Sequence, residues 1–414
     1  MPANDQTTAS QISSGAARPL VLINFSLCVF TFTTANWMLH SFLPIYMKAQ
    51  GIADGEIGSI LGLVSISALV LMLPLGVLSD LLSPRRLVLF GGCIFLLFAA
   101  GMLTAKVYWQ FLMVAPLGGM AGSAFYIVLY ALFLKVIDRN SVGKKIAFYQ
   151  SGMYLGFGVG PAIGGLLVRE GGFTALLLGA LAGGLVVIAL ILRLPETETF
   201  RLDMGGYQRD LRQSRTLLFL VLAFVYATHF GVEQTSFTLL MKESLGFPAT
   251  RIGLVYLAIG SWMAVIAPFA GHRFDADQNL RTLLLCGLVI SGIFQIATSM
   301  VPSFPYMIVV RLLHTVGDVM MILSMGVMTA AFFPGARMGG SSAVVFATRT
   351  CGVFTGNLGS GFINGAMGYS TSFIVSGGVL LAFVILAGAA LARVLVVKDD
   401  LRSATRIEHT GPPR

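Results

Sequence analysis

Twelve long apolar stretches run along this chain, and they constrain its fold more than any other feature. An α-helix of about 20 residues crosses the ~30 Å hydrocarbon core of a bilayer. Because lipid offers the backbone no hydrogen-bond partner, such stretches are expected to be helical. We therefore expect an all-helical membrane protein, with spans near 20–46, 57–80, 87–105, 110–136, 146–168, 173–194, 216–241, 252–272, 281–301, 304–332, 341–365 and 370–397.

The composition supports a protein embedded in lipid. Only 11% of the 414 residues are charged, whereas a soluble domain carries about 25%. A soluble enzyme, a coiled coil and a disordered chain are thereby excluded. The four cysteines lie inside apolar stretches without CxxC spacing, so neither a disulfide framework nor a zinc site is indicated.

The basic residues predict how the chain is oriented. With both termini inside, 20 of the 27 Lys and Arg residues fall on the inner side, 5 on the outer side and 2 within spans. This bias predicts cytoplasmic termini in a membrane like the bacterial inner membrane, with basic loops that contact anionic lipid. The net charge of +9 is then a signal of topology, and nucleic acid is not an expected partner.

The second half of the sequence repeats features of the first at an offset of about 195 residues. Ile57-Gly58 returns as Ile252-Gly253, and the spacing of Gly156 and Gly160 returns at Gly352 and Gly356. Parallel repeats of six helices around a central site are a transporter architecture. We expect a tail (1–19), a six-helix bundle (20–194), a polar loop (195–215), a second bundle (216–397) and a tail (398–414).

A charged motif between the second and third spans identifies a family. The stretch from Gly76 through Asp80 to Arg85 and Arg86 resembles the G-x-x-x-D-x-x-x-x-R-[RK] signature of the major facilitator superfamily. Gly271 to Asp275 is a weaker second copy. The resemblance implies two pseudo-symmetric bundles that alternate access to a central site, with these residues in gating. A plain charged loop is the alternative.

The fifth span is dense in glycine. Gly156, Gly160, Pro161 and Gly164 are similar to a G-x-x-x-G-P motif found in antiporters of the superfamily, and generic small-residue packing is the alternative. The superfamily's helix 4 arginine, frequent in proton-coupled drug exporters, is missing: the matching stretch begins at Ala115. Proton coupling of that type is therefore not expected in the first half.

Ionisable residues within spans concentrate in the second half. Arg311, His314 and Asp318 share one face of the tenth span, and His229 and Glu233 share a face of the seventh. In the superfamily these spans line the cavity. We expect Glu233 and Asp318 to carry protons, with His314 and Arg311 as partners. The alternatives are a static salt-bridge network and a metal site of His229, Glu233, His314 and Asp318.

Candidate substrate contacts come from both halves. They are Asn36, Trp37 and His40 on the first span, Tyr126 and Tyr130 on the fourth, and His229 and Arg349 in the second half. Trp37 and His40 could instead anchor the helix at the membrane interface, and the tyrosines could simply pack. Arg311 and Arg349 are also candidate anchors for an anionic substrate.

The function predicted from these features is secondary transport, most simply proton-coupled export of small, partly apolar compounds by a monomer. No Walker A sequence GxxxxGK[ST] occurs, and no nucleophile–base pair is identifiable, so neither an ATP-driven pump nor an enzyme is expected, and no cofactor. The rival functions are transport of a polar or anionic metabolite, transport of a divalent metal such as iron, and a non-transporting scaffold.

Overall fold

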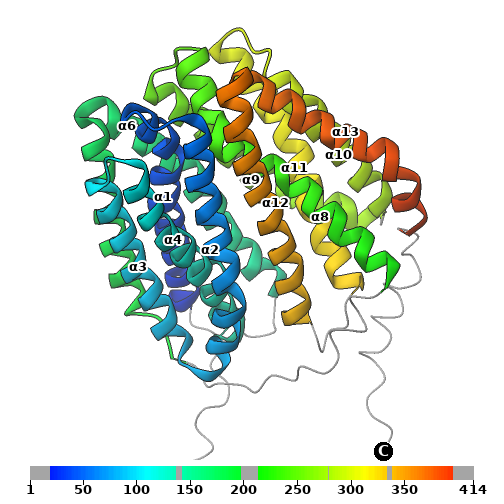
Figure 1. Cartoon of the computed structure of the whole chain (residues 1–414). Coiled ribbons are helices and arrows are strands. Elements are labelled where there is room, and N and C mark those ends of the chain that lie inside the picture. The colour runs from blue at the N-terminus through cyan, green and yellow to red at the C-terminus, as the bar shows by residue number, and fades with distance from the viewer. Residues whose placement is uncertain (1–18, 137–141, 197–212, 278, 333–337, 395–414) are drawn as a thin grey trace, which may run out of the picture.

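A computed structural model describes residues 19–136, 142–196, 213–277, 279–332 and 338–394. Figure 1 shows the first-half helices, blue to teal, beside the second-half helices, green to red. The first half contains α1 (Pro19–Ala49), α2 (Asp54–Leu81), α3 (Pro84–Thr104), α4 (Tyr108–Ser123) with its continuations η1 (Ala124–Leu129) and α5 (Tyr130–Val136), and α6 (Val142–Ile191). The second half contains α8 (Ser214–Val232) with η2 (Glu233–Phe237) and η3 (Leu240–Ser244), α9 (Ala249–Asp277), α10 (Leu280–Thr298), α11 (Phe304–Phe332), α12 (Met338–Met367) and α13 (Tyr369–Val394).

Twelve membrane-length helices result within the described ranges, because α6 consists of two helices separated by a break. The break lies at Gly171 and Gly172, and Gly172 has φ +67°, a left-handed conformation that favours glycine. Each predicted span coincides with one helix, and the helices extend a few residues beyond most predicted ends. The expected all-α fold of two pseudo-symmetric six-helix bundles is confirmed.

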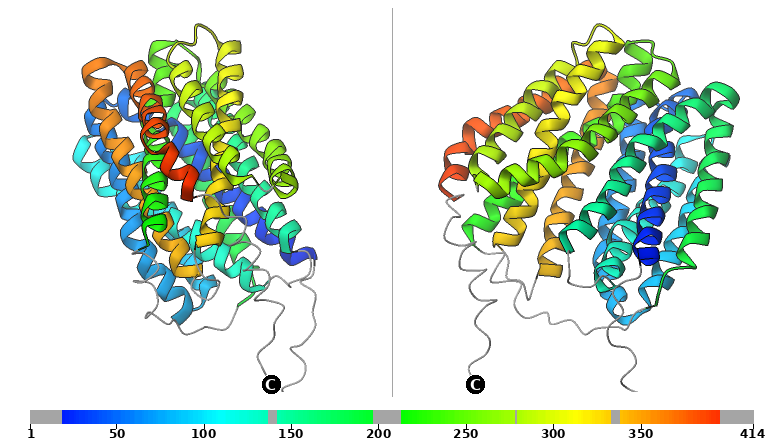
Figure 2. Two further views of the ribbon diagram at one scale, coloured as in Figure 1. Left: turned by 90° about the vertical axis from the view of Figure 1, so that its right-hand side faces the viewer. Right: turned by 180° about the vertical axis from the view of Figure 1, so that it is seen from behind.

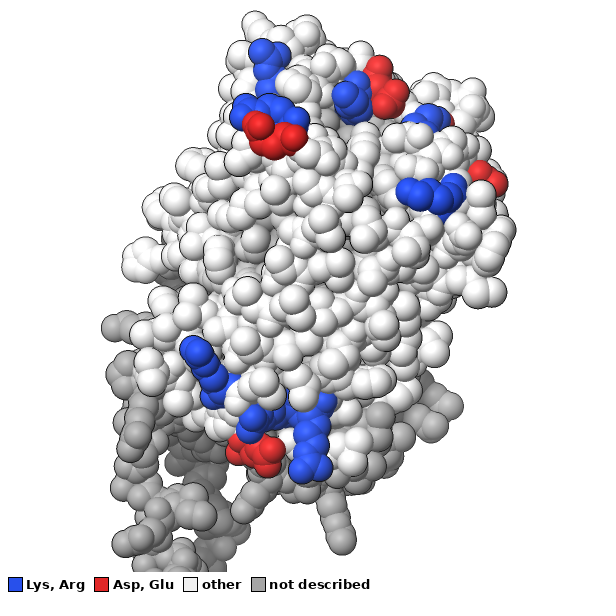
Figure 3. Space-filling view, turned by 90° about the vertical axis from the view of Figure 1, so that its left-hand side faces the viewer, with Lys and Arg blue, Asp and Glu red and all other residues white. Residues whose placement is uncertain are grey.

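The two ends of the bundle are distinct. We call the end where α1 begins and α13 ends the terminal side, and the end with the turns after α1 and α3 the distal side. On the face drawn in Figure 3, charged side chains lie toward these two ends, and a broad uncharged band separates them. This distribution is the one a bilayer requires, since ions are costly in its core.

The predicted repeat appears as matching backbone contacts. A Cβ on Gly156 or Gly160 of α6 would meet carbonyls of α1, at 2.7 Å from that of Phe30 and 2.3 Å from that of Thr34. In the second half, a Cβ on Gly352 or Gly356 of α12 would likewise meet backbone carbonyls of α8. Small residues thus let the equivalent helix pair of each half approach closely.

The halves contact each other on the distal side. There α2 packs on α12 and α6 packs on α9. A Cβ on Gly58 would lie 2.8 Å from the Cα of Gly361, and a Cβ on Gly260 would lie 2.7 Å from the Cα of Gly158. Toward the terminal side the helices of the two halves diverge (Figure 2). We call these glycine contacts the distal contact.

Candidate functional site

The second half holds a buried polar cluster at the level where α8 becomes η2. Glu233 is the first residue of this π-helical turn, a local geometry often found at functional sites. By helical rise, Asp318 lies at the midpoint of α11, and Glu233 lies ~6 Å to the distal side of the midpoint of the helix that α8 begins. The cluster therefore lies deep within the membrane.

Glu233 and Arg311 form its distal part. Nη2 of Arg311 lies 2.5 Å from Oε1 of Glu233, and its Nη1 donates a 3.4 Å hydrogen bond to Gln295. The guanidinium also lies 4.5 Å from the ring centre of Phe237. Both Nη atoms of Arg311 are paired with groups of its own half, whereas its Nε makes no hydrogen bond among the described residues. The Glu233 side chain retains 16% exposure.

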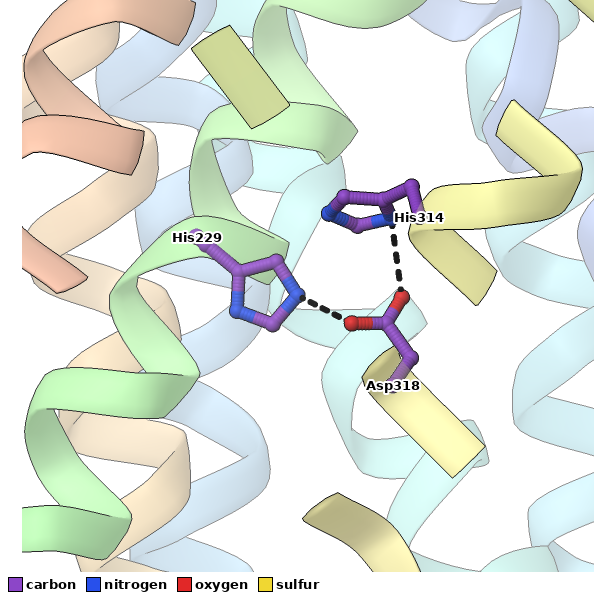
Figure 4. A group of neighbouring side chains, drawn as sticks. All are labelled: His229, His314 and Asp318. Carbon is purple, nitrogen blue, oxygen red and sulfur yellow. Dashed lines mark ion pairs between the residues drawn. The ribbon is translucent and has the colours of Figure 1, made fainter. Parts of the chain in front are cut away.

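Asp318 lies between two buried histidines (Figure 4). Its Oδ1 is 3.3 Å from Nε2 of His229, and its Oδ2 is 3.2 Å from Nδ1 of His314. Hydroxyls of Tyr226 and Ser291 each donate a 3.0 Å hydrogen bond to Oδ1. Nδ1 of His314 also lies 3.8 Å from Glu233, so the two carboxylates belong to one connected cluster.

The remaining ring nitrogens fix the protonation pattern. Nδ1 of His229 closely contacts the carbonyl of Tyr226, which can only accept, so this nitrogen carries a proton. Nε2 of His314 lies 3.3 Å from the Ser291 oxygen, whose own hydrogen is directed to Asp318. In its neutral form His229 therefore turns a lone pair toward the Asp318 carboxylate, and His314 does so in the tautomer that carries its hydrogen on Nε2. Neither facing nitrogen makes a hydrogen bond within the described residues.

The charges of the cluster do not balance. With neutral histidines, the two carboxylates and the single guanidinium leave one uncompensated negative charge in a buried site. A carboxylate facing two lone pairs repels both, and one added cation relieves this repulsion. The arrangement can therefore accept a proton or a metal ion. Ligand atoms of His229, His314 and Asp318 lie within 4.8 Å of one another, as a metal site requires.

The first-half candidates occupy an aromatic environment. Tyr126 packs edge-on against Phe32, and its hydroxyl is buried without a hydrogen-bond partner among the described residues. Trp37 packs against Phe157 at 4.5 Å between ring centres. Asn36 is buried, and Trp37 lies ~5 Å from the midpoint of α1, well inside the membrane.

His40 and Tyr130 are held by packing. His40 stacks on Phe98 at 5.6 Å, within its own bundle, and Tyr130 packs on Tyr149 at 5.5 Å. Neither geometry resembles a helix anchor at the membrane surface. The structure does not join these first-half residues to the charged cluster of the second half.

The structure describes some of the predicted gating residues. Nη2 of Arg85 donates a 2.6 Å hydrogen bond to the carbonyl of Leu192, tying α3 to the end of α6, and Arg86 is exposed. Gly160 and Pro161 are buried in the first part of α6, and the Pro161 carbonyl meets Gly253 of α9. The side chains at Gly76, Asp80 and Asp275 lie outside the described residues.

Sequence reasoning missed a polar junction between the halves. Asn357 of α12 is fully buried and donates 3.1 Å hydrogen bonds to Ser65 of α2 and Gln234 of η2. Its Oδ1 accepts a 2.8 Å bond from Thr235. Gln234 and Thr235 directly follow Glu233, so the junction links the cluster to the first half. The available signal was an amide side chain within an apolar span.

Comparison with known proteins decides the family. The model of the Major Facilitator Superfamily matches residues 25–275 and 218–410, which together cover most of the chain. This chain belongs to the major facilitator superfamily. The protein is thus a membrane transporter, not an enzyme. An uncharacterised MFS-type transporter of Methanocaldococcus jannaschii is 20% identical over 362 residues, 84% of this chain and 93% of that protein.

Two further relatives match shorter parts of this superfamily member. A probable drug/proton antiporter of Saccharomyces cerevisiae is 28% identical over 187 residues, 42% of this chain and 34% of the yeast protein. A probable 4-methylmuconolactone transporter of Cupriavidus pinatubonensis is 30% identical over 143 residues, 32% of this chain and 33% of that protein.

Solved structures share the fold. A nucleoside transporter aligns with a TM-score of 0.74 at 12% identity, over 89% of this chain and 99% of the other. A bacterial homologue of the human lysosomal transporter Spinster, in an inward-facing and unoccupied conformation, aligns with a TM-score of 0.73 at 12% identity, over 94% and 99%.

Proposed function

We propose that this protein is a proton-coupled secondary transporter in which the cluster around Glu233 and Asp318 binds the coupling proton. The observation that carries the proposal is the position of the buried Asp318 carboxylate between two histidine nitrogens, beside the Glu233–Arg311 pair. Buried ionisable groups inside a membrane bundle are costly and typically belong to proton relays or substrate pathways. The proton would relieve the repulsion at Asp318 in one state and leave in the other.

The polar junction at Asn357 supplies the conformational part of the proposal. A proton bound between α8 and α11 changes the charge beside η2, and η2 carries Gln234 and Thr235, which bond to Asn357. Asn357 in turn bonds across to α2. Loading of the cluster can therefore bias whether the halves separate on the distal side, which is what alternating access requires.

Export is the direction that we propose, with both termini in the cytoplasm of a bacterial cell. Support comes from the 20-to-5 distribution of basic residues and from the antiporter-like glycine motif, whose residues Gly156 and Gly160 make real helix contacts. The similarity of part of the chain to a probable drug/proton antiporter points the same way.

The test is proton flux in proteoliposomes that contain the full chain and a pH-sensitive dye. Amphipathic cations, organic anions, sugars and divalent metals are added in turn to wild type, to Glu233→Gln and to Glu243→Gln. Glu243 is an exposed carboxylate at the distal end of the same helix, so its variant is the matched control. The expected result is proton movement with one substrate class in wild type and the control, and none in Glu233→Gln.

Equal substrate transport without protons in wild type and Glu233→Gln would overturn the proposal and leave a uniporter with a structural cluster. The metal-ligand geometry favours a second candidate, transport of a divalent metal through His229, His314 and Asp318. That function requires metal-dependent flux in wild type that is lost in His229→Ala, while metals leave a proton transporter unaffected.

A further inference from the structure

Arg349 is a second ionisable group at membrane depth, separate from the charged cluster. It lies in α12, ~5 Å from the helix midpoint toward the terminal side, and its side chain is half-buried. In the described parts of the chain, no carboxylate lies within 4 Å of its guanidinium, and none of its five N–H groups donates a hydrogen bond. Its Nε is fully buried.

The contrast with Arg311 shows what is missing. Arg311 has a carboxylate, an amide and an aromatic face as partners, all from the second half. Arg349 has the ring of Phe346 at 6.0 Å as its nearest aromatic partner in the described structure. A guanidinium stays charged at any physiological pH, and its cost inside a membrane is high unless water or an anion compensates it. A structural arginine in this position would be paired.

The surroundings of Arg349 place it toward the space between the halves. The phenols of Tyr226, from α8, and Tyr154, from α6, lie within electrostatic reach of the guanidinium. Tyr154 belongs to the first half, so groups of both bundles surround the same cation. Among the described residues no carboxylate contributes to this environment, so the guanidinium has no described counter-ion.

We infer that Arg349 is the anchor for an anionic group of the transported molecule, which is therefore a small organic anion. The planar fork of the guanidinium matches the two oxygens of a carboxylate or phosphonate. Phe346 offers an apolar surface beside the fork, and the Tyr154 hydroxyl is a potential donor to the same anion. The inference rests on the proposed transport function, for which it names the substrate class.

The test measures ligand binding to the purified full chain in nanodiscs by thermal shift and calorimetry. The probes are benzoate, phenylacetate, cinnamate and phenylphosphonate, with benzamide, phenylacetamide and cinnamamide as neutral analogues. The variants are Arg349→Gln, Arg349→Lys and the control Arg251→Gln, since Arg251 also lies near a ring, that of Phe304 at 5.6 Å, but is exposed.

We expect wild type to bind at least one anion about tenfold or more tightly than its amide, as the loss of a charged hydrogen bond predicts. Arg349→Gln should abolish this preference, Arg349→Lys should retain part of it, and Arg251→Gln should leave it unchanged. The inference is overturned if no anion is preferred over its amide, or if the preference survives in Arg349→Gln. If Arg349→Gln fails to fold, the anion preference of wild type is compared with that of Arg349→Lys. An undiminished preference in Arg349→Lys then overturns the inference.

Failure of this inference and failure of proton coupling give different results. Proton coupling fails when wild type and Glu233→Gln transport substrate equally without moving protons, whatever their anion affinity. The Arg349 inference fails when anion preference does not depend on Arg349, even if Glu233→Gln abolishes proton flux. The two residues are therefore tested by independent signals.

Discussion

The interiors of the two halves differ, although their helices pack in the same way. In the first half, Phe32, Phe125 and Tyr126 form an aromatic stack, with Phe32 and Phe125 at 3.7 Å between ring centres. Its described carboxylates lie at helix ends, at Asp54, Glu56, Glu170 and Glu196. In the second half the equivalent depth holds two carboxylates, two histidines and Arg311.

This difference shows that two halves with the same helix packing can have interiors of different chemistry. The glycine contacts that repeat between the halves, such as Gly156 with α1 and Gly352 with α8, preserve the backbone arrangement. The side chains that face inward are free to diverge once that arrangement is secured. We interpret the first half as an apolar wall and the second half as the site of charge chemistry.

The largest expected effect comes from breaking the charge pair of the second half. Arg311→Ala leaves Glu233 unpaired and should lower stability by about 3–5 kcal/mol, as for other buried pairs that lose one partner. Thermal unfolding in detergent measures this loss. The double variant with Glu233→Ala should recover part of it, and a double variant as unstable as the single one would argue against a coupled pair.

The next largest effect is expected from Gly260→Ala, which tests whether the distal contact holds the two halves together. In Gly260→Ala the new Cβ would lie 2.6 Å from the backbone nitrogen of Gly158, so the halves cannot close as they do here. Overpacking of this kind costs about 1–3 kcal/mol, which corresponds to a shift of roughly 5- to 150-fold toward distal opening. Distances between spin labels on the distal ends of α2 and α12 report the shift.

Gly359→Ala is its matched control, because Gly359 lies on α12 near Gly361 of the distal contact and meets nothing within 4 Å. Equal label distances in Gly260→Ala and Gly359→Ala would show that the glycine contact does not hold the halves together.

A smaller shift is expected from the polar junction. Asn357→Ala removes the hydrogen bonds to Ser65 and Gln234 and the side-chain acceptor of Thr235, costing about 1–3 kcal/mol. Because Ser65 is in the other half, part of this loss destabilises the conformation in which the two halves are in contact on the distal side. The same label distances should lengthen on the distal side.

Asn364→Ala separates this effect from general destabilisation. Asn364 lies on the same helix and bonds to Ser236 and Ser372, both within the second half. It should lower the unfolding temperature without changing the label distances. A change as large as that of Asn357→Ala would mean that the junction has no special role.

The sequence predicts the fold well because its signals are local. Span length and spacing predicted all twelve helices, and the repeat predicted which glycines would be equivalent. Helical spacing predicted that Arg311, His314 and Asp318 would share one helix face, and His229 and Glu233 another. The partners Tyr226, Ser291 and Asn357 escaped prediction, because a hydroxyl or amide within an apolar run does not reveal its contact across the bundle.

The smallest and sharpest comparison uses one tyrosine from each half. Tyr226→Phe removes a 3.0 Å hydrogen bond to Asp318, worth about 1 kcal/mol, from the anionic form of the cluster. Because the lost bond stabilised the carboxylate, the pH midpoint of proton-coupled flux should move upward by several tenths of a unit. Tyr126→Phe removes a hydroxyl without a described partner and should leave that midpoint unchanged. Equal midpoints in the two variants would place the coupling proton elsewhere than Asp318, and the division between the halves would lose its chemical basis.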